Sequence, residues 1–165
     1  MKNILVPALL LIASVAFGQQ KFGHLNTGNV LELMPDTKEA NTQLLIFQKE
    51  LTARGETMAR MLEDKIVRYN TEAPNMTAND RQARETVLRG EQQELSAFSE
   101  EAKARLDGKR AELLKPIILK VKDAVKAVAL ENKYNYIFDV SSGNMLYVND
   151  SEDVVALVKK KLNLQ

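Results

Sequence analysis

The side chains that usually carry acid–base, nucleophilic or metal chemistry are scarce in this sequence. Its 165 residues contain one histidine, His24, and no cysteine. This excludes disulfides, Cys-ligated zinc, iron–sulfur clusters, a Cys nucleophile and any motif that needs two imidazoles. His24 lies on a predicted strand, so we expect a buried or half-buried neutral imidazole rather than a metal ligand or a catalytic base.

Two adjacent acidic pairs are the other candidates for chemistry. Glu63 and Asp64, and likewise Glu100 and Glu101, lie in segments predicted to be helical. Neighbouring residues on a helix point in different directions, so both pairs are expected to be solvated surface charges. The sequence also lacks G-x-G-x-x-G, Walker-type and G-x-S-x-G motifs. We therefore expect no enzymatic activity, no metal, no cofactor and no nucleotide-driven cycle.

Charge and composition narrow the class of protein further. Lys and Arg number 23 against 22 Asp and Glu, for a formal net charge of +1. Nucleic-acid binding usually needs a basic domain, so no nucleic-acid partner is expected. Contact with a membrane surface is left open but has no support from the charge. Aromatic residues are 5% and charged residues 27% of the chain, which is typical of long amphipathic helices.

The first 18 residues have the pattern of a secretory signal peptide. Lys2 precedes an apolar run from Ile4 to Phe17, and Ala16 and Gly18 supply the small residues of a cleavage site. The alternative is a membrane anchor, but the run falls short of the roughly 20 residues that a spanning helix needs. We expect export, with cleavage after Gly18.

The middle of the sequence predicts two long helices joined by a tight break. Residues 36–73 contain dense charge, one Gly and no Pro, until Pro74 interrupts the pattern. Thr77 or Asn79 can cap a second helix that continues to about residue 132. A short break forces the two helices antiparallel. Residues 36–133 are therefore predicted to form a helical hairpin, here called the arm, with its tip near residues 74–78.

Apolar residues in the arm recur every three or four positions, as in an antiparallel coiled coil. The seam of the first helix includes Leu44, Leu51 and Met58, which are seven residues apart. Polar or small residues interrupt the seam at Gln48, Gly55, Lys65 and Lys109. A glycine inside a helix costs about 1 kcal/mol relative to alanine, so we expect a soft arm. Pro116 predicts a kink in the second helix.

Residues 19–35 and 134–165, with the base of the second long helix (about 113–133), are predicted to form a small body. Alternating or β-branched and aromatic residues predict three short strands, at 21–27, 134–140 and 145–148. A brief helix at 30–34 and a final helix capped by Asp150 or Ser151 complete the body. The predicted fold class is α+β, mostly α.

So small a body cannot cover both faces of a sheet or protect its edges. We therefore expect it to complete its core with copies of itself, through the end that bears the strands. The candidates for this shared core are apolar residues of the predicted strands: Leu25, Ile137, Phe138, Val140, Leu146 and Val148.

The order of these features resembles the Skp/OmpH family of periplasmic chaperones over essentially the whole mature chain. The specific part is the segment from Pro116 to Leu162, with VKAVA at 125–129, YIFD at 136–139 and MLY at 145–147. The resemblance implies a homotrimer with a barrel-like β body and three helical arms around a cavity. It also implies an ATP-independent periplasmic holdase for unfolded outer-membrane proteins. The neutral charge departs from strongly basic relatives.

On this interpretation, apolar side chains of the arm are candidates for contacting an unfolded protein, here called the client. The candidates are Phe47, Leu51, Met58, Met61, Met76 and Phe98. Methionine suits this role because it adapts to irregular apolar partners. The alternative is that these side chains only pack the hairpin. Met76, at the tip, is expected to be exposed.

A second function class stays open: a secreted structural or adaptor protein whose arms pair with a partner coiled coil. A dedicated zipper should show unbroken apolar positions along its seam. The interruptions at Gln48, Gly55, Lys65 and Lys109 favour the holdase.

Overall fold

The computed structural model describes residues 20–164, so the predicted signal peptide lies outside the described residues. The chain divides into two compact units, the body (residues 20–33 and 119–164) and the arm (residues 34–118). Among the described residues, none of the helices has the length and apolar content that crossing a bilayer would require.

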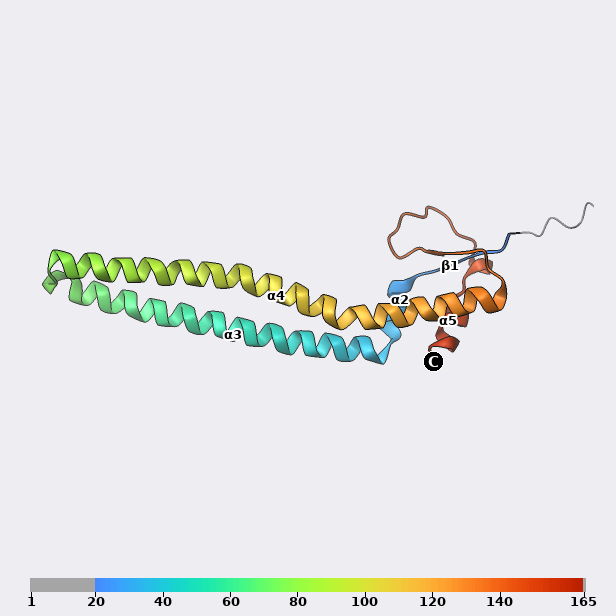
Figure 1. Ribbon diagram of the computed structural model, residues 1–165, viewed down its shortest axis with the longest axis horizontal. Helices are drawn as coiled ribbons and strands as arrows, with labels where there is room; N and C mark the ends of the chain where they lie inside the picture. The colour runs from blue at the N-terminus through green and yellow to red at the C-terminus, as the bar shows by residue number, and fades with distance from the viewer. Residues whose placement is uncertain (1–19, 165) are drawn as a thin grey trace, which may run out of the picture. The chain divides into compact units, whose positions relative to one another are not determined.

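The arm is an antiparallel pair of long helices (Figure 1). Helix α3 (Pro35–Glu72) leads through the short 3-10 helix η2 (Ala73–Asn75) into helix α4 (Ala78–Asn132), whose later part belongs to the body. Pro35 occupies the first turn of α3, where its missing N–H is not needed. Thr77 caps α4: its hydroxyl accepts from the Asp80 N–H at 3.2 Å and donates to the Asp80 carboxylate at 2.7 Å. The predicted hairpin is therefore present, with its turn where Pro74 breaks the pattern.

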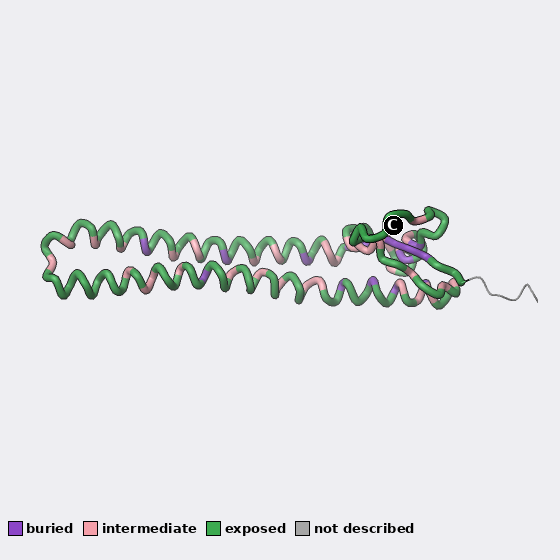
Figure 2. The backbone as a smooth tube through the Cα atoms, turned by 90° about the horizontal axis from the view of Figure 1, so that it is seen from above, coloured by how far each residue is buried: buried purple, intermediate pink, exposed green. Residues whose placement is uncertain are grey.

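The seam between the two arm helices is thin. Few residues along the arm are buried (Figure 2), and on the hairpin Leu51, Leu62 and Phe98 keep 7–8% exposure. Gly55 lies beside Phe98, where an added Cβ would stand 3.4 Å from the ring. The guanidinium of Arg54 lies 5.1 Å from the centre of the same ring. This part of the seam is therefore apolar and aromatic. Helix α4 continues through Pro116, and the kink stays a prediction.

The body is built on two parallel strands, β1 (Phe22–Leu25) and β2 (Tyr136–Asp139). On the other side of β1, the His24 carbonyl accepts from the Val154 N–H at 2.9 Å, next to a bridge between His24 and Asp153. Helix α2 (Thr27–Leu33), η3 (Asp150–Glu152) and helix α5 (Val155–Lys161) complete the body. Its fully buried side chains are Leu25, Val30, Val128, Val154 and Val158.

Two sequence predictions for the body differ from the structure. The third strand, predicted at 145–148, is wrong for the single chain, because this segment is irregular and Leu146 and Tyr147 are 102% and 81% exposed. A strand needs a hydrogen-bonded neighbour, and 145–148 pairs with neither strand: β1 lies between β2 and the 153–154 segment, and the outer edge of β2 stays unpaired among the described residues. The short helix begins at Thr27 rather than at residue 30. The α+β class with a helical hairpin arm is confirmed.

Candidate functional site

The six arm residues that were predicted to contact a client differ in how far they are exposed. Leu51 and Phe98 are buried in the seam, so they pack the hairpin. Phe47, Met58 and Met76 are half-buried, which corrects the expectation that Met76 is exposed: it folds back from the turn. Met61 is 55% exposed. The role of all six in client binding stays a prediction.

Other arm residues, which the sequence analysis missed, expose more apolar surface. Leu45 and Ile46 are 52% and 53% exposed, and Ile66 and Val67 are 40% and 58% exposed. The two pairs lie on α3, three heptads apart, and therefore about 30 Å apart along the helix. Adjacent apolar residues on a helix cannot both face the seam, and this was the signal available in the sequence.

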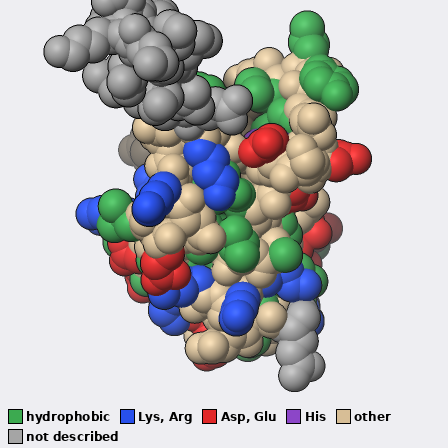
Figure 3. Space-filling view, turned by 90° about the vertical axis from the view of Figure 1, so that its right-hand side faces the viewer, with side chains coloured by type: hydrophobic (Ala, Val, Ile, Leu, Met, Phe, Trp, Pro, Cys, Tyr) green, Lys and Arg blue, Asp and Glu red, His purple; other side chains and the backbone are tan. Residues whose placement is uncertain are grey.

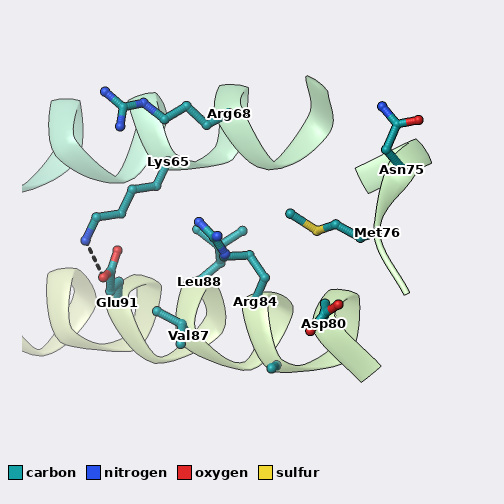
Figure 4. Close-up of a pocket in the computed structure, with 10 residues that line it drawn as sticks. Lys65, Arg68, Asn75, Met76, Asp80, Arg84, Val87, Leu88 and Glu91 are labelled. Carbon is teal, nitrogen blue, oxygen red and sulfur yellow. Dashed lines mark hydrogen bonds and ion pairs between the residues drawn. The ribbon is translucent and has the colours of Figure 1, made fainter. Parts of the chain in front are cut away.

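The distal end of the arm contains a hollow. Its volume is about 730 Å³, and it lies between α3 and α4 next to the turn. Figure 4 shows Met76 pointing back from the turn into the space between the helices, toward Leu88. The lining combines these apolar groups with the long side chains of Lys65, Arg68 and Arg84.

Polar contacts join the two helices around this hollow. The Lys65 ammonium pairs with Glu91, and the Arg84 guanidinium lies 3.9 Å from Glu72. The Tyr69 hydroxyl donates to the Glu85 carboxylate, and this hydrogen bond raises the pKa of Tyr69 above its usual range. Lys65, an interruption of the predicted seam, therefore has a partner on the other helix.

The body exposes an aromatic face on its strands. Phe22, Tyr136 and Phe138 stack on one another, with ring centres 5.8 to 6.4 Å apart, yet remain 42%, 58% and 43% exposed. In Figure 3 hydrophobic side chains reach the surface at several places on the body face that is shown. Such an arrangement can bury aromatic area against a second surface.

The six predicted shared-core residues divide in the same way. Leu25 is buried within its own chain at 2% exposure, so it supports the sheet from inside. Ile137, Val140 and Val148 are half-buried. Phe138 and Leu146 are exposed. All of the six except Leu25 therefore keep surface that another chain could cover.

Two polar groups hold the strands of the body in place. The His24 Nε2–H donates to the Asn149 carbonyl at 3.0 Å, and His24 is 8% exposed, in line with the expected buried imidazole. Asp139 accepts from the Thr27 hydroxyl at 2.5 Å and from the Ser141 N–H at 2.9 Å. Desolvation pushes the pKa of Asp139 up, but these hydrogen bonds together outweigh it and lower the pKa below its usual value. Both groups have structural partners, and residues 20–164 contain no cluster of His, Asp and Glu suited to a metal ion.

The structure thus combines a small α+β body, a thinly packed helical hairpin arm and exposed apolar surfaces. The family model described as outer membrane protein (OmpH-like) matches residues 21–162, so the chain belongs to the OmpH-like family. This confirms the family indicated by the sequence.

Similar proteins agree with this assignment. The chain is 24% identical over 159 residues to the chaperone protein Skp of Pectobacterium atrosepticum, and 25% identical over 157 residues to that of Yersinia enterocolitica. Each alignment covers 93% of both proteins. A solved structure of an OmpH-like protein from Caulobacter crescentus matches with a TM-score of 0.72 at 10% identity, over 87% of this chain and 84% of that one. The family consists of chaperones and not of enzymes, which confirms the expectation of no enzymatic activity.

Proposed function

We propose that this protein is an exported, periplasmic, ATP-independent holdase that binds unfolded outer-membrane β-barrel proteins and prevents their aggregation. The observation that carries the proposal is the exposed apolar surface of α3. The chain that bears it belongs to a family of chaperones. An unfolded β-barrel chain offers many apolar side chains that can cover such surface. Each contact buries little area, at about 25 cal/mol per Å², but several together give useful and reversible affinity.

The proposed assembly is a homotrimer with a shared β core and three arms around a cavity. The stacked face of Phe22, Tyr136 and Phe138, with the exposed Leu146 and Tyr147, supports assembly through the body. Exposed apolar surface of this kind usually marks an interaction site.

The assembly is tested with Ile137→Asp and Phe138→Asp. An unpaired carboxylate buried in an interface costs several kcal/mol, so each variant should run as a monomer in size-exclusion chromatography with light scattering. Far-ultraviolet circular dichroism separates dissociation from unfolding. A variant that stays trimeric with unchanged melting would contradict assembly through β2.

The holdase function is tested with an unfolded porin that aggregates on dilution from urea. The wild type should suppress light scattering and co-elute with the porin. Replacing Leu45, Ile46, Ile66 and Val67 by serine should weaken the affinity at least tenfold, since each loses about 1 kcal/mol of apolar burial. The matched control replaces four exposed polar residues of α3, Thr42, Thr52, Thr57 and Thr71, by serine and should bind as the wild type does.

A further variant separates holdase from adaptor. In it a short glycine-rich turn replaces residues 55–90, and the oligomer should survive while protection of the porin falls. Equal protection by the full-length and shortened proteins would place binding on the body. An adaptor should ignore unfolded porins of different sequence and bind one partner at a fixed ratio.

A further inference from the structure

The burial of side chains in the arm changes along its length. Within residues 63–97, all of which the structure describes, no side chain is buried. The last buried residue before this stretch is Leu62 and the first after it is Phe98. In Figure 2 the tip end of the arm carries intermediate and exposed residues only. We call residues 63–97 the distal segment and the rest of the hairpin the proximal seam.

Where an apolar seam would lie, the distal segment has a hollow surrounded by polar contacts. The hollow of about 730 Å³ separates Met76 from the lining groups of α4. The Lys65–Glu91 pair has side chains that are 43% and 26% exposed, and the Arg84–Glu72 pair 46% and 52%. Ion pairs this exposed contribute little to stability. The distal segment is therefore held closed mainly by contacts that water can replace.

Gly90 weakens the same segment further. A Cβ added at Gly90 would meet nothing within 4 Å, so no close packing requires a glycine there. Relative to alanine, glycine lowers the population of a helix at one position about fivefold. The proximal seam offers a matched site, because a Cβ at Gly108 would likewise meet nothing within 4 Å.

We propose that the distal segment opens locally, with α3 and α4 separating and the helix around Gly90 unwinding, while the proximal seam stays closed, and that the open form receives apolar side chains of the client. The second half of this proposal rests on the holdase function proposed above. Opening frees Met76, Leu88 and Leu95, which are half-buried in the closed hairpin. These flexible aliphatic side chains suit clients of varied sequence.

The tip is built to close again after each opening. Thr77 and Asp80 cap the start of α4 with two hydrogen bonds, and the Met76 N–H donates to the Ala73 carbonyl at 3.2 Å. These contacts are local in sequence, so they survive a separation of the two helices. The turn therefore keeps α3 and α4 joined and in register.

The first test is hydrogen–deuterium exchange of the full mature oligomer without a client. Amides of the distal segment should exchange at least tenfold faster than those of residues 44–62 and 99–112, because local opening limits protection. Gly90→Ala should slow distal exchange about fivefold, whereas Gly108→Ala should leave it unchanged. Equal protection of the two regions, or an equal effect of both variants on the distal amides, would overturn the opening.

The second test is the affinity of the same three proteins for a fluorescent unfolded porin. If the client binds the open form, its apparent dissociation constant rises as that form becomes rarer. Gly90→Ala should therefore weaken binding about fivefold, the factor by which it slows exchange, and Gly108→Ala should not. Slower distal exchange with unchanged affinity would overturn client binding by the open form and leave the holdase function standing. No binding by the wild type would instead refute the holdase function, and the exchange result would still decide the opening.

Discussion

In the body, Val30, Val154 and Val158 are 0% exposed, whereas along the hairpin Leu51, Leu62 and Phe98 keep 7–8%. The body surrounds its core with two strands and three helices, so its side chains meet neighbours on several sides. The hairpin has one helix on each side of its seam, so every seam residue borders water. The body can therefore specify one arrangement, while the arm can adjust its surface at small cost.

The largest expected difference is in the free energy of unfolding lost by two leucine-to-alanine substitutions, one in the body and one in the arm. Leu25→Ala should lower the free energy of unfolding by about 3 kcal/mol, because it leaves a cavity in a closed core. Leu51→Ala should cost about 1–2 kcal/mol, because it loses the free energy of burying the removed side-chain atoms but leaves no closed cavity. A groove of about 300 Å³ already runs beside Leu51, so water can fill the space.

Urea denaturation at one fixed protein concentration measures both losses, since assembly makes stability depend on concentration. Equal losses in the two variants would show that the hairpin seam is as closed as the body core.

Glycine-to-alanine substitutions should differ in sign between the two regions. At Gly23 an added Cβ would lie 2.9 Å from Val154 Cγ1 and 3.0 Å from Tyr134 Cε1. Gly23→Ala should therefore destabilise the body by about 1–3 kcal/mol through overpacking. Gly108→Ala should stabilise the arm by about 1 kcal/mol. Thermal melting followed by circular dichroism checks both, and a stable Gly23→Ala protein would mean that the body can shift as readily as the arm.

The helices of the arm could be predicted from the sequence because their signals are local. Pro74 and the charged, heptad-spaced residues on either side predict helix ends within two residues of those observed. The three arm glycines could not be distinguished in this way. Only the structure shows Phe98 beside Gly55 and open space at Gly90 and Gly108.

The body was predicted less well because its contacts join distant parts of the chain. The start of α2 depends on Asp139, 112 residues away, which accepts the Thr27 N–H at 3.2 Å. The strand predicted at 145–148 has the right residue types, but in the described chain this segment pairs with neither β1 nor β2. The exposed pairs Leu45–Ile46 and Ile66–Val67 lie partly outside the heptad seam, so the seam pattern does not single them out.

Acid and alkali should act on different regions. The pKa of Asp139 is lowered in the folded body, so its stabilising effect is present above the unfolded pKa and is lost as pH falls through the folded one. The body should therefore weaken below about pH 4. Asp139 accepts from the Thr27 N–H and hydroxyl at the first residue of α2. Asp139→Asn weakens this capping interaction, so it should lower stability at neutral pH by about 1 kcal/mol and should reduce the acid dependence. An unchanged acid profile in this variant would assign the effect to other carboxyl groups.

The pKa of Tyr69 is raised in the folded arm, so the stabilising effect of its hydrogen bond is complete below the unfolded pKa. It is lost as pH rises through the folded value, above about pH 10. Hydrogen exchange referenced to Tyr69→Phe should show this loss in the distal segment and not in the body. A Tyr69→Phe protein whose distal segment loosens equally in alkali would show that Tyr69 is not the group responsible.

The smallest effect is expected from salt on client binding. The predicted hairpin, residues 36–133, contains 18 basic and 17 acidic side chains, a net charge of +1. The arm as the structure bounds it, residues 34–118, contains 14 basic and 15 acidic side chains, a net charge of −1, so it is close to neutral. The basic residues near the tip have acidic neighbours: Arg84 lies 3.9 Å from Glu72, and Glu85 lies beside Arg84 in sequence. Charges separated by more than about 8 Å are largely screened at physiological ionic strength. Long-range attraction of a client by the arm should therefore be weak.

If apolar contacts along the arm dominate, affinity for a fluorescent unfolded porin should change less than about threefold between roughly 50 and 300 mM salt. If a basic patch of Arg81, Arg84 and Arg89 dominates, the affinity should fall steeply with salt. Replacing these three arginines by glutamine provides the control, because it should flatten any steep dependence while leaving apolar binding in place. A fall of about a hundredfold in the wild type would refute the apolar account and move the binding surface from α3 to the charged side of α4.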